Sequence, residues 1–201
     1  MTQSLTPRSL VSALVLLLSL LGASAPARAE TYRVDLILFV DLWASGSEAG
    51  AAPAAANIRN AIDLDDVSKL RAAGIELLPE DQFALLDQWQ HLRYSKQFKP
   101  LLRLAWTQKD PPQERGPALR LKIGGNAADG TPPMVDGSVA LLLSRYLHVD
   151  ADLQYVSEGQ AWQLDERRKM RRDEVHHLDS AKLGILAQVS KPGAGPDPTT
   201  P

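Results

Sequence analysis

Residues 31–40 read Thr31-Tyr32-Arg33-Val34-Asp35-Leu36-Ile37-Leu38-Phe39-Val40, and this stretch sets the fold that we expect for the chain. Its first half alternates polar and apolar side chains, whereas its second half is apolar at every position. Alternation with a period of two is typical of a strand with one solvent-facing side. A run that is apolar on both faces is typical of a strand inside a sheet. We therefore predict a strand that begins half-exposed and ends buried, at the centre of a sheet.

Strand periodicity returns several times after this first segment. It is found in residues 101–108, 118–123, 136–153, 161–172 and 183–189. The third of these is longer than an ordinary strand, which predicts a bulge or bend near Arg145. A short helix is predicted within residues 60–73. A second helix should begin at Pro79-Glu80-Asp81, because proline and acids favour a first helical turn, and should end near Ser95.

These elements predict the α+β class: one domain over residues 30–190 with a mainly antiparallel β-sheet and one or two covering helices. Residues 44–57 are rich in alanine and glycine and predict a flexible loop. Residues 191–201 are rich in proline and predict a disordered tail.

The first 29 residues have the pattern of a secretory signal peptide. Arg8 precedes an apolar run from Leu10 to Leu21, and Ala27-Arg28-Ala29 offers a cleavage site before Glu30. The apolar run is shorter than the ~20 residues that a membrane-spanning helix requires. No second apolar span follows, so the mature chain should be exported and should not cross a membrane.

Composition excludes several classes of site. The chain contains no cysteine, which excludes disulfides, thiolate metal ligands and a cysteine nucleophile. It has 22 basic and 24 acidic residues, a formal net charge of −2, so the whole protein has no electrostatic drive toward nucleic acid. Any binding of anions must therefore be local.

The densest local charge is the cation run at residues 167–172, in which every position except Met170 is arginine or lysine. On a strand, Arg167, Lys169 and Arg171 would point to one side and Arg168 and Arg172 to the other. Guanidinium groups on one face can hold a carboxylate or phosphate through paired hydrogen bonds.

A second interpretation of the cation run stays open. Charged side chains on an edge strand prevent edge-to-edge pairing, and these cations could pair internally with Asp150, Asp152 or Glu174. Surface charge rows of this kind are common in proteins.

Catalytic and metal-binding patterns are weak. His176, His177 and Asp179 follow the cation run, and His148 beside Asp150 could join them around a metal, but no HExxH spacing is present. Histidines that hydrogen-bond a turn are the commoner case. Neither a GxSxG elbow nor an SxxK motif occurs. We assign no catalytic residue, no metal and no cofactor.

The order of short motifs along the chain resembles the CsiV family of Gram-negative envelope proteins. The motifs are Ile37-Leu38-Phe39, Leu78-Pro79, Ala105-Trp106-x-Gln108, Asp136-Gly137, Arg145-Tyr146-Leu147-His148, Arg167-Arg168-x-Met170-Arg171 and Glu174-x-His176-x-Leu178-Asp179. The resemblance implies a non-enzymatic periplasmic protein that binds peptidoglycan and supports cell-wall assembly and cell shape. It also implies a partner, a lipoprotein activator of a penicillin-binding protein.

Residue chemistry and the family resemblance both indicate the cation run as a binding site. The stem peptides of peptidoglycan carry free carboxylates, and the cation run could bind them. The hypothesis is a binding site composed of Arg167, Arg168, Arg171, Tyr146, His148, His176 and Asp179. Two other functions stay open: a structural interaction module of the envelope that does not contact glycan, and a cell-wall hydrolase.

Overall fold

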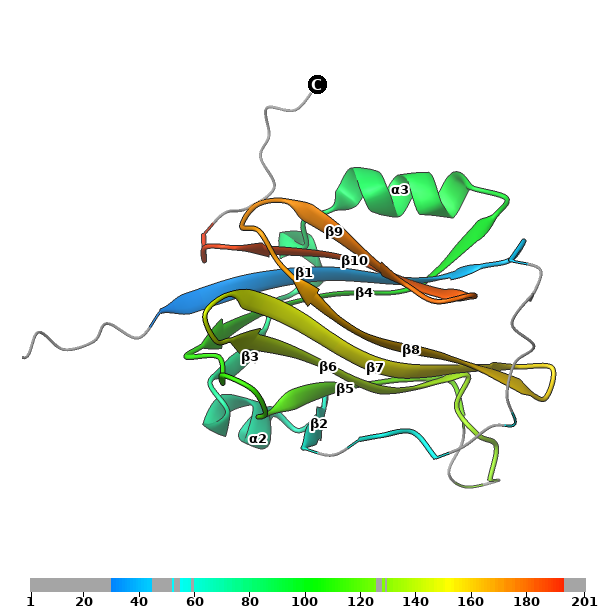
Figure 1. The fold of residues 1–201 in the computed structure, drawn as a ribbon, viewed down its shortest axis with the longest axis horizontal. Coiled ribbons are helices and arrows are strands. Elements are labelled where there is room, and N and C mark those ends of the chain that lie inside the picture. Colours follow the sequence, from blue (N-terminus) through cyan, green and yellow to red (C-terminus); the bar gives the residue numbers. More distant parts are fainter. Residues whose placement is uncertain are drawn as a thin grey trace, which may run out of the picture.

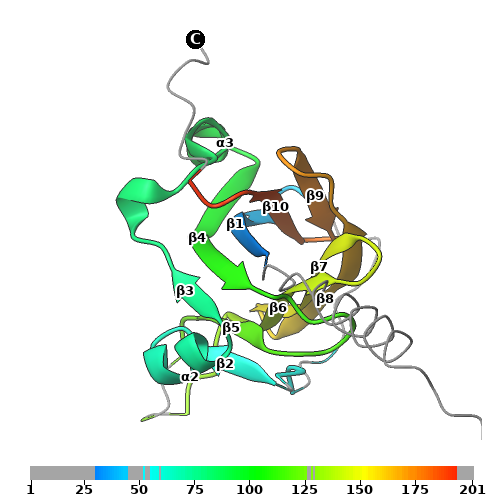
Figure 2. The same ribbon diagram turned by 90° about the vertical axis from the view of Figure 1, so that its left-hand side faces the viewer.

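The structure, a computed structural model, describes residues 30–44, 52, 55–58, 60–125, 128 and 130–193. Within these residues the strands form two five-stranded sheets that face each other (Figure 2). In spatial order, sheet A contains β3 (Ile75–Leu77), β4 (Phe98–Lys109), β1 (Thr31–Asp41), β10 (Leu183–Ser190) and β9 (Val175–Asp179). Sheet B contains β2 (Ala61–Asp63), β5 (Ala118–Ile123), β6 (Val135–Leu143), β7 (Leu147–Ser157) and β8 (Gln160–Lys169). Paired neighbours are antiparallel, except that β2 and β5 run parallel.

Strand β1 lies at the centre of sheet A, between β4 and β10 (Figure 1). One face of β1 packs into the main core between the two sheets, with the side chains Tyr32, Val34, Leu36, Leu38 and Val40. That core also takes Leu121, Leu141 and Leu153 from sheet B. The prediction of a central strand is confirmed, and so is the α+β class. The predicted half-exposed start is wrong, because every residue from Tyr32 to Val40 is buried, including Arg33 and Asp35.

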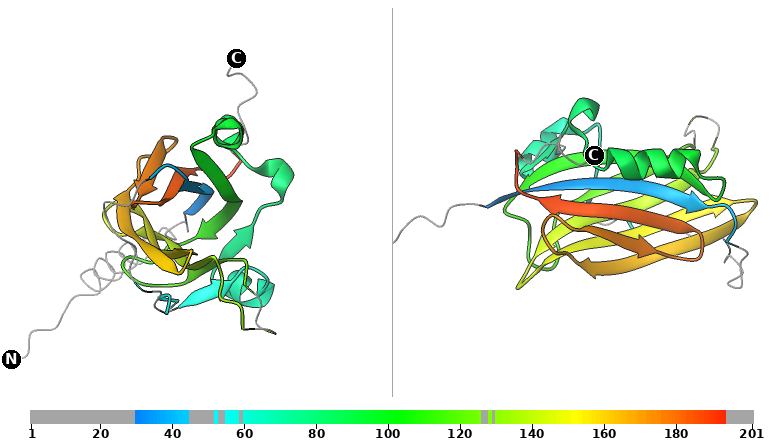
Figure 3. Two further views of the ribbon diagram at one scale, coloured as in Figure 1. Left: turned by 90° about the vertical axis from the view of Figure 1, so that its right-hand side faces the viewer. Right: turned by 90° about the horizontal axis from the view of Figure 1, so that it is seen from above.

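The opposite face of β1 is covered by helix α3 (Leu86–Tyr94), which lies over sheet A (Figures 1 and 3). Ile37 and Phe39 form a second, smaller core with Leu85 and Leu92. The two apolar faces that the sequence shows in the second half of β1 therefore have two different partners, a sheet and a helix. Helix α2 (Val67–Ala72) is the short helix predicted within residues 60–73.

The predicted start of the second helix, at Pro79, is wrong. A single 3-10 turn, η1 (Glu80–Gln82), follows Pro79, and α3 begins only at Leu86. The intervening backbone binds β1 instead of continuing a helix. The Asp35 carboxylate accepts a hydrogen bond from the Ala84 N–H at 2.8 Å, and the Arg33 guanidinium donates to the Gln82 carbonyl. The helix ends at Tyr94 with Ser95 as its C-cap, which confirms the predicted end near Ser95.

The long extended segment predicted at residues 136–153 is two strands. Strands β6 and β7 form an antiparallel hairpin in which Leu143 faces Leu147. The expected bend near Arg145 is the turn between them, closed by a 3.2 Å hydrogen bond from the Ser144 N–H to the Tyr146 carbonyl. Three short strands, β2, β3 and β9, were not predicted, and neither was the division of the strands into two sheets.

Three predicted segments lie wholly or largely outside the described residues. These are the signal peptide at residues 1–29, most of the loop at 44–57 and the tail beyond residue 193. Among the described residues, no helix is both long enough and apolar enough to cross a membrane.

We expect the buried ion pair on β1 to control stability. Arg33 and Asp35 are both almost fully buried, and the guanidinium binds the carboxylate at 2.7 and 2.9 Å. Asp35→Ala should lower the free energy of unfolding by about 3–5 kcal/mol, because it leaves a buried guanidinium without its carboxylate. Urea denaturation at pH 7 measures the loss.

The matched control removes both charges. The double variant Arg33→Met/Asp35→Leu should lose less stability than Asp35→Ala, because no unpaired charge stays buried. If the double variant loses as much free energy of unfolding as Asp35→Ala, or more, then the ion pair itself stabilises β1. The unpaired guanidinium would then not be the cause of the loss in Asp35→Ala.

Candidate functional site

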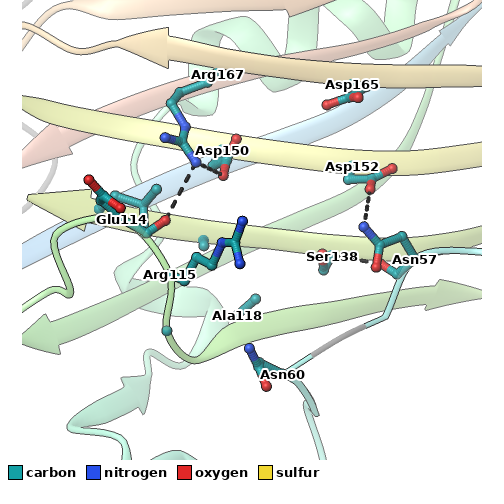
Figure 4. Close-up of a pocket in the computed structure, with 13 residues that line it drawn as sticks. Asn57, Asn60, Glu114, Arg115, Ala118, Ser138, Asp150, Asp152, Asp165 and Arg167 are labelled. Atoms are coloured by element: carbon teal, nitrogen blue, oxygen red, sulfur yellow. Dashed lines mark hydrogen bonds and ion pairs between the residues drawn. The ribbon is translucent and has the colours of Figure 1, made fainter.

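The outer face of sheet B carries the candidate site, a groove of about 450 Å³ (Figure 4). Its floor is formed by small or apolar side chains, among them Ala118, Ala140 and the buried Leu142. Its walls are polar or charged and come from β7, β8, the loop before β5 and the segment at Asn57. A second hollow of about 440 Å³ adjoins it and shares Glu114, Arg115, Leu142 and Arg167 with it. It extends the groove toward His148.

Strand register places the charges of the groove in two rows across the sheet. Ala140 faces Asp150, which faces Arg167 on the next strand. Two residues further along β7, Asp152 lies between Ser138 and Asp165. Since a strand rises about 3.3 Å per residue, the two rows lie ~7 Å apart. One row therefore ends in a cation and the other in two carboxylates.

The loop before β5 closes one side of the groove and presents Arg115 to it (Figure 4). The Pro112 carbonyl accepts a 2.8 Å hydrogen bond from the Leu143 N–H at the end of β6, which fixes the loop to the sheet. A side chain at Gly116 would collide with the Pro112 ring, because a Cβ there would lie 2.3 Å from the Pro112 Cγ. Glycine at this position therefore lets the loop fold tightly beside the groove.

Most charges at the groove have internal partners. Arg167 donates to the Asp150 carboxylate at 2.7 Å, and this hydrogen bond raises the pKa of Arg167 above its ordinary value. Asp152 accepts hydrogen bonds from Asn57 at 2.8 Å and from Gln163. By contrast, Arg115 and Asp165 make no ion pair or side-chain hydrogen bond within the part of the chain that the structure describes. The groove is thus lined by a guanidinium and a carboxylate that have no partner among the described residues.

Of the seven residues predicted to bind a ligand, Arg167 and His148 lie in the groove and Tyr146 lies beside it. Arg167 lines both hollows, and His148 lines the second. The His148 Nδ1 lies 2.9 Å from the Tyr146 carbonyl oxygen. The Lys169 ammonium, at the end of β8, lies 3.3 Å from the centre of the Tyr146 ring, so the ring contacts a cation.

The other four predicted residues lie elsewhere. Strand β8 ends at Lys169 and Met170 is buried, so the chain leaves sheet B before it reaches Arg171. Arg168 pairs with Glu166 at 2.6 Å, and Glu166 also accepts a hydrogen bond from the Asp179 N–H at 3.2 Å. The cation run therefore does not form one continuous binding face.

His176 has a structural contact rather than a place in the groove. Its Nε2 accepts a 3.0 Å hydrogen bond from the Arg171 N–H, in the turn that leads into β9. The Arg171 guanidinium lies 3.7 Å from the Glu174 carboxylate and is largely exposed. The alternative interpretation, in which the cations pair with Asp150 and Glu174, is confirmed for these two acids.

Arg172, the last cation of the run, joins the beginning of β1 to the end of β8. It binds Glu30 at 2.7 Å and lies 3.4 Å from the Tyr32 hydroxyl, which donates to Glu30 at 2.6 Å. Burial raises the pKa of Tyr32, and its hydrogen bond to Glu30 raises that pKa further. The same hydrogen bond is the main cause of a lowered pKa at Glu30.

The histidines and acids do not assemble a metal centre in the described part of the chain, where no group of three or more possible ligands occurs. His148 and Asp150 belong to sheet B, whereas His176 and Asp179 belong to β9 of sheet A. His176 and Asp179 are three residues apart on a strand, so their side chains point to opposite faces of it.

Sequence reasoning missed Arg115, Asp165 and the floor of the groove. The segment 110–116 has the composition of a turn, and nothing in its sequence indicates that it folds back onto β6. One signal was present: His148, Asp150 and Asp152 alternate with apolar residues, which is typical of a polar face on a strand.

The groove is open, with an apolar floor and walls that carry both charges, and such a surface suits a polar, charged ligand. The model of the CsiV family, described as peptidoglycan-binding protein, matches residues 9–192. The chain belongs to the CsiV family. No curated protein and no solved structure gives a significant match.

The raised pKa of Tyr32 predicts a loss of stability at alkaline pH. A raised pKa in the folded state stabilises the protein below the unfolded value of ~10, and this contribution disappears as the pH rises through the folded value. Between pH 9 and pH 11, the free energy of unfolding should therefore fall more steeply for the wild type than for Tyr32→Phe. Urea denaturation at several pH values measures both slopes. Parallel slopes would contradict the assignment.

Proposed function

We propose that the chain binds peptidoglycan through the groove on sheet B and does not cleave it. The observation that carries the proposal is the family match over residues 9–192, since the family is described as peptidoglycan-binding. The groove on the described part of the chain supports the proposal, because it is open and polar. Arg115, Arg167 and the aspartates offer both donors and acceptors over a floor that a sugar or an alanine side chain can contact.

The chemistry of peptidoglycan suits such a groove. Its glycan strands present hydroxyl and amide groups, and its stem peptides present carboxylates and small apolar side chains. Carboxylates accept hydrogen bonds from hydroxyl and amide donors, and guanidinium groups bind carboxylates through two parallel hydrogen bonds. Ala118, Ala140 and Leu142 provide the apolar contact.

We also propose a cellular context for this binding. The signal pattern of residues 1–29 supports export to the periplasm, where peptidoglycan is accessible. There the protein would support cell-wall assembly and cell shape together with a lipoprotein activator of a penicillin-binding protein. Support for the partner comes from the family resemblance, and co-purification of that lipoprotein with the tagged protein from membranes tests it.

Blocking the groove should reduce binding to the cell wall. Ala140 lies on the floor, so Ala140→Tyr should fill the groove while the side chain still points away from the core. We expect binding to purified sacculi to weaken about ten-fold, equivalent to 1.4 kcal/mol. Co-sedimentation with increasing amounts of sacculi measures the change.

The matched control is Val175→Tyr, which places the same side chain at an exposed position on β9 of sheet A. It should bind sacculi like the wild type. Unchanged binding by a folded Ala140→Tyr variant would exclude the groove. Release of soluble muropeptides by the wild type would favour the hydrolase, and absence of sedimentation would favour the interaction module.

Export predicts a defined mature N-terminus. If cleavage follows Ala29, the protein recovered from the periplasm should begin with Glu30 and should lack the apolar run from Leu10 to Leu21. N-terminal sequencing and intact mass measurement test this. A protein that keeps residues 1–29 and stays with the membrane would show that the segment is an uncleaved anchor.

A further inference from the structure

We propose that the groove on sheet B recognises a ligand segment that carries both a free carboxylate and a free ammonium. This inference rests on the proposed function and narrows it. In peptidoglycan, the segment with that chemistry is a stem peptide whose diamino acid is not cross-linked. Arg115, assisted by Arg167, would bind the carboxylate, and Asp165, assisted by Asp152, would bind the ammonium (Figure 4).

The cationic part of the groove has unused donors. Arg115 makes no ion pair or side-chain hydrogen bond to the described residues, and its side chain extends from the loop into the groove (Figure 4). Both hydrogen bonds of Arg167, to Asp150 and to the Glu114 carbonyl, use its Nη2 atom. A guanidinium has five N–H donors, so Arg167 keeps others for a ligand. Two guanidinium groups therefore border the same space.

Among the described residues, no cation forms an ion pair with the carboxylates of Asp152 or Asp165, which form the anionic part of the groove. Asp152 and Asp165 face each other directly on β7 and β8, an arrangement in which like charges destabilise a sheet. Asp152 is bound by the neutral amides of Asn57 and Gln163. The nearby Arg120 is engaged by Asp136 and Asp63. An ammonium bound between the two carboxylates would relieve their repulsion.

The distance between the two rows selects the kind of ligand. The row of Arg167 and the row of Asp165 are separated by two residues along β8, ~7 Å. The carboxylate and ammonium of a single α-amino acid are carried by one carbon and are too close together to occupy both rows. In a stem peptide, the side-chain ammonium of the diamino acid lies several bonds from the carboxylate that ends the peptide, so these two groups can reach the two rows. The geometry therefore favours a stem peptide over free amino acids or bare glycan.

Two soluble probes test the charge requirement with the full chain. One is a disaccharide tetrapeptide with a free side-chain amine on its diamino acid, and the other is the same molecule with that amine acetylated. The free-amine probe should displace the wild type from sacculi at about ten-fold lower concentration, because acetylation removes the charge that Asp165 would bind. Isothermal titration with each probe gives the same comparison directly.

Variants assign each end of the groove. Asp165→Asn should abolish the preference between the two probes, whereas Arg115→Gln should weaken both by about ten-fold and keep the preference. Both side chains are exposed, so folding should be unaffected. Arg171→Gln, which alters an exposed arginine outside the groove, should behave like the wild type.

The outcomes separate this inference from the function on which it rests. Wild-type sedimentation with sacculi combined with equal competition by both probes would overturn the inference and leave peptidoglycan binding in place. Absence of sedimentation would overturn both. An unchanged preference in Asp165→Asn would also overturn the inference, since the ammonium would then be recognised elsewhere.

Discussion

Burial of β1 on both of its faces is the constraint from which the rest of the architecture follows. An apolar strand of this length is stable only when a separate layer covers each face. Sheet B covers one face and supplies the main core, and α3 covers the second half of the other. Where the outer face carries Arg33 and Asp35 instead of apolar residues, the segment at Gln82 and Ala84 supplies the hydrogen bonds that these buried charges require.

Sheet B differs from β1 because only one of its faces is buried. Its inward residues complete the core, and its outward residues are free to be polar, as an antiparallel sheet allows. The loop before β5 and the segment at Asn57 fold against that outer face and turn it into a groove. The core and the groove therefore lie on opposite faces of the same four strands, β5 to β8.

Prediction succeeded where one segment determines its own structure. The periodicity of β1, β5 and β10 identified them as strands, and α3 ends at Tyr94, close to the end predicted near Ser95. Prediction failed where contacts between residues far apart in the sequence determine the local structure. Helix α3 begins late because Asp35 and Arg33 hold the preceding backbone, and the cations after Arg167 separate because Met170 turns inward to the core. Neither contact is encoded in the local pattern.

The sequence by itself determined the strand periods, the polar face that holds His148, Asp150 and Asp152, the absence of thiol chemistry and the kinship with a peptidoglycan-binding family. Only the tertiary structure decided which charges stay free. The net effect of a cation depends on the carboxylate that folding brings within a few ångströms of it. In the fold, the four arginines of the cation run pair with Asp150, Glu166, Glu174 and Glu30. Arg115 and Asp165 line the groove and form no ion pair with any residue that the structure describes.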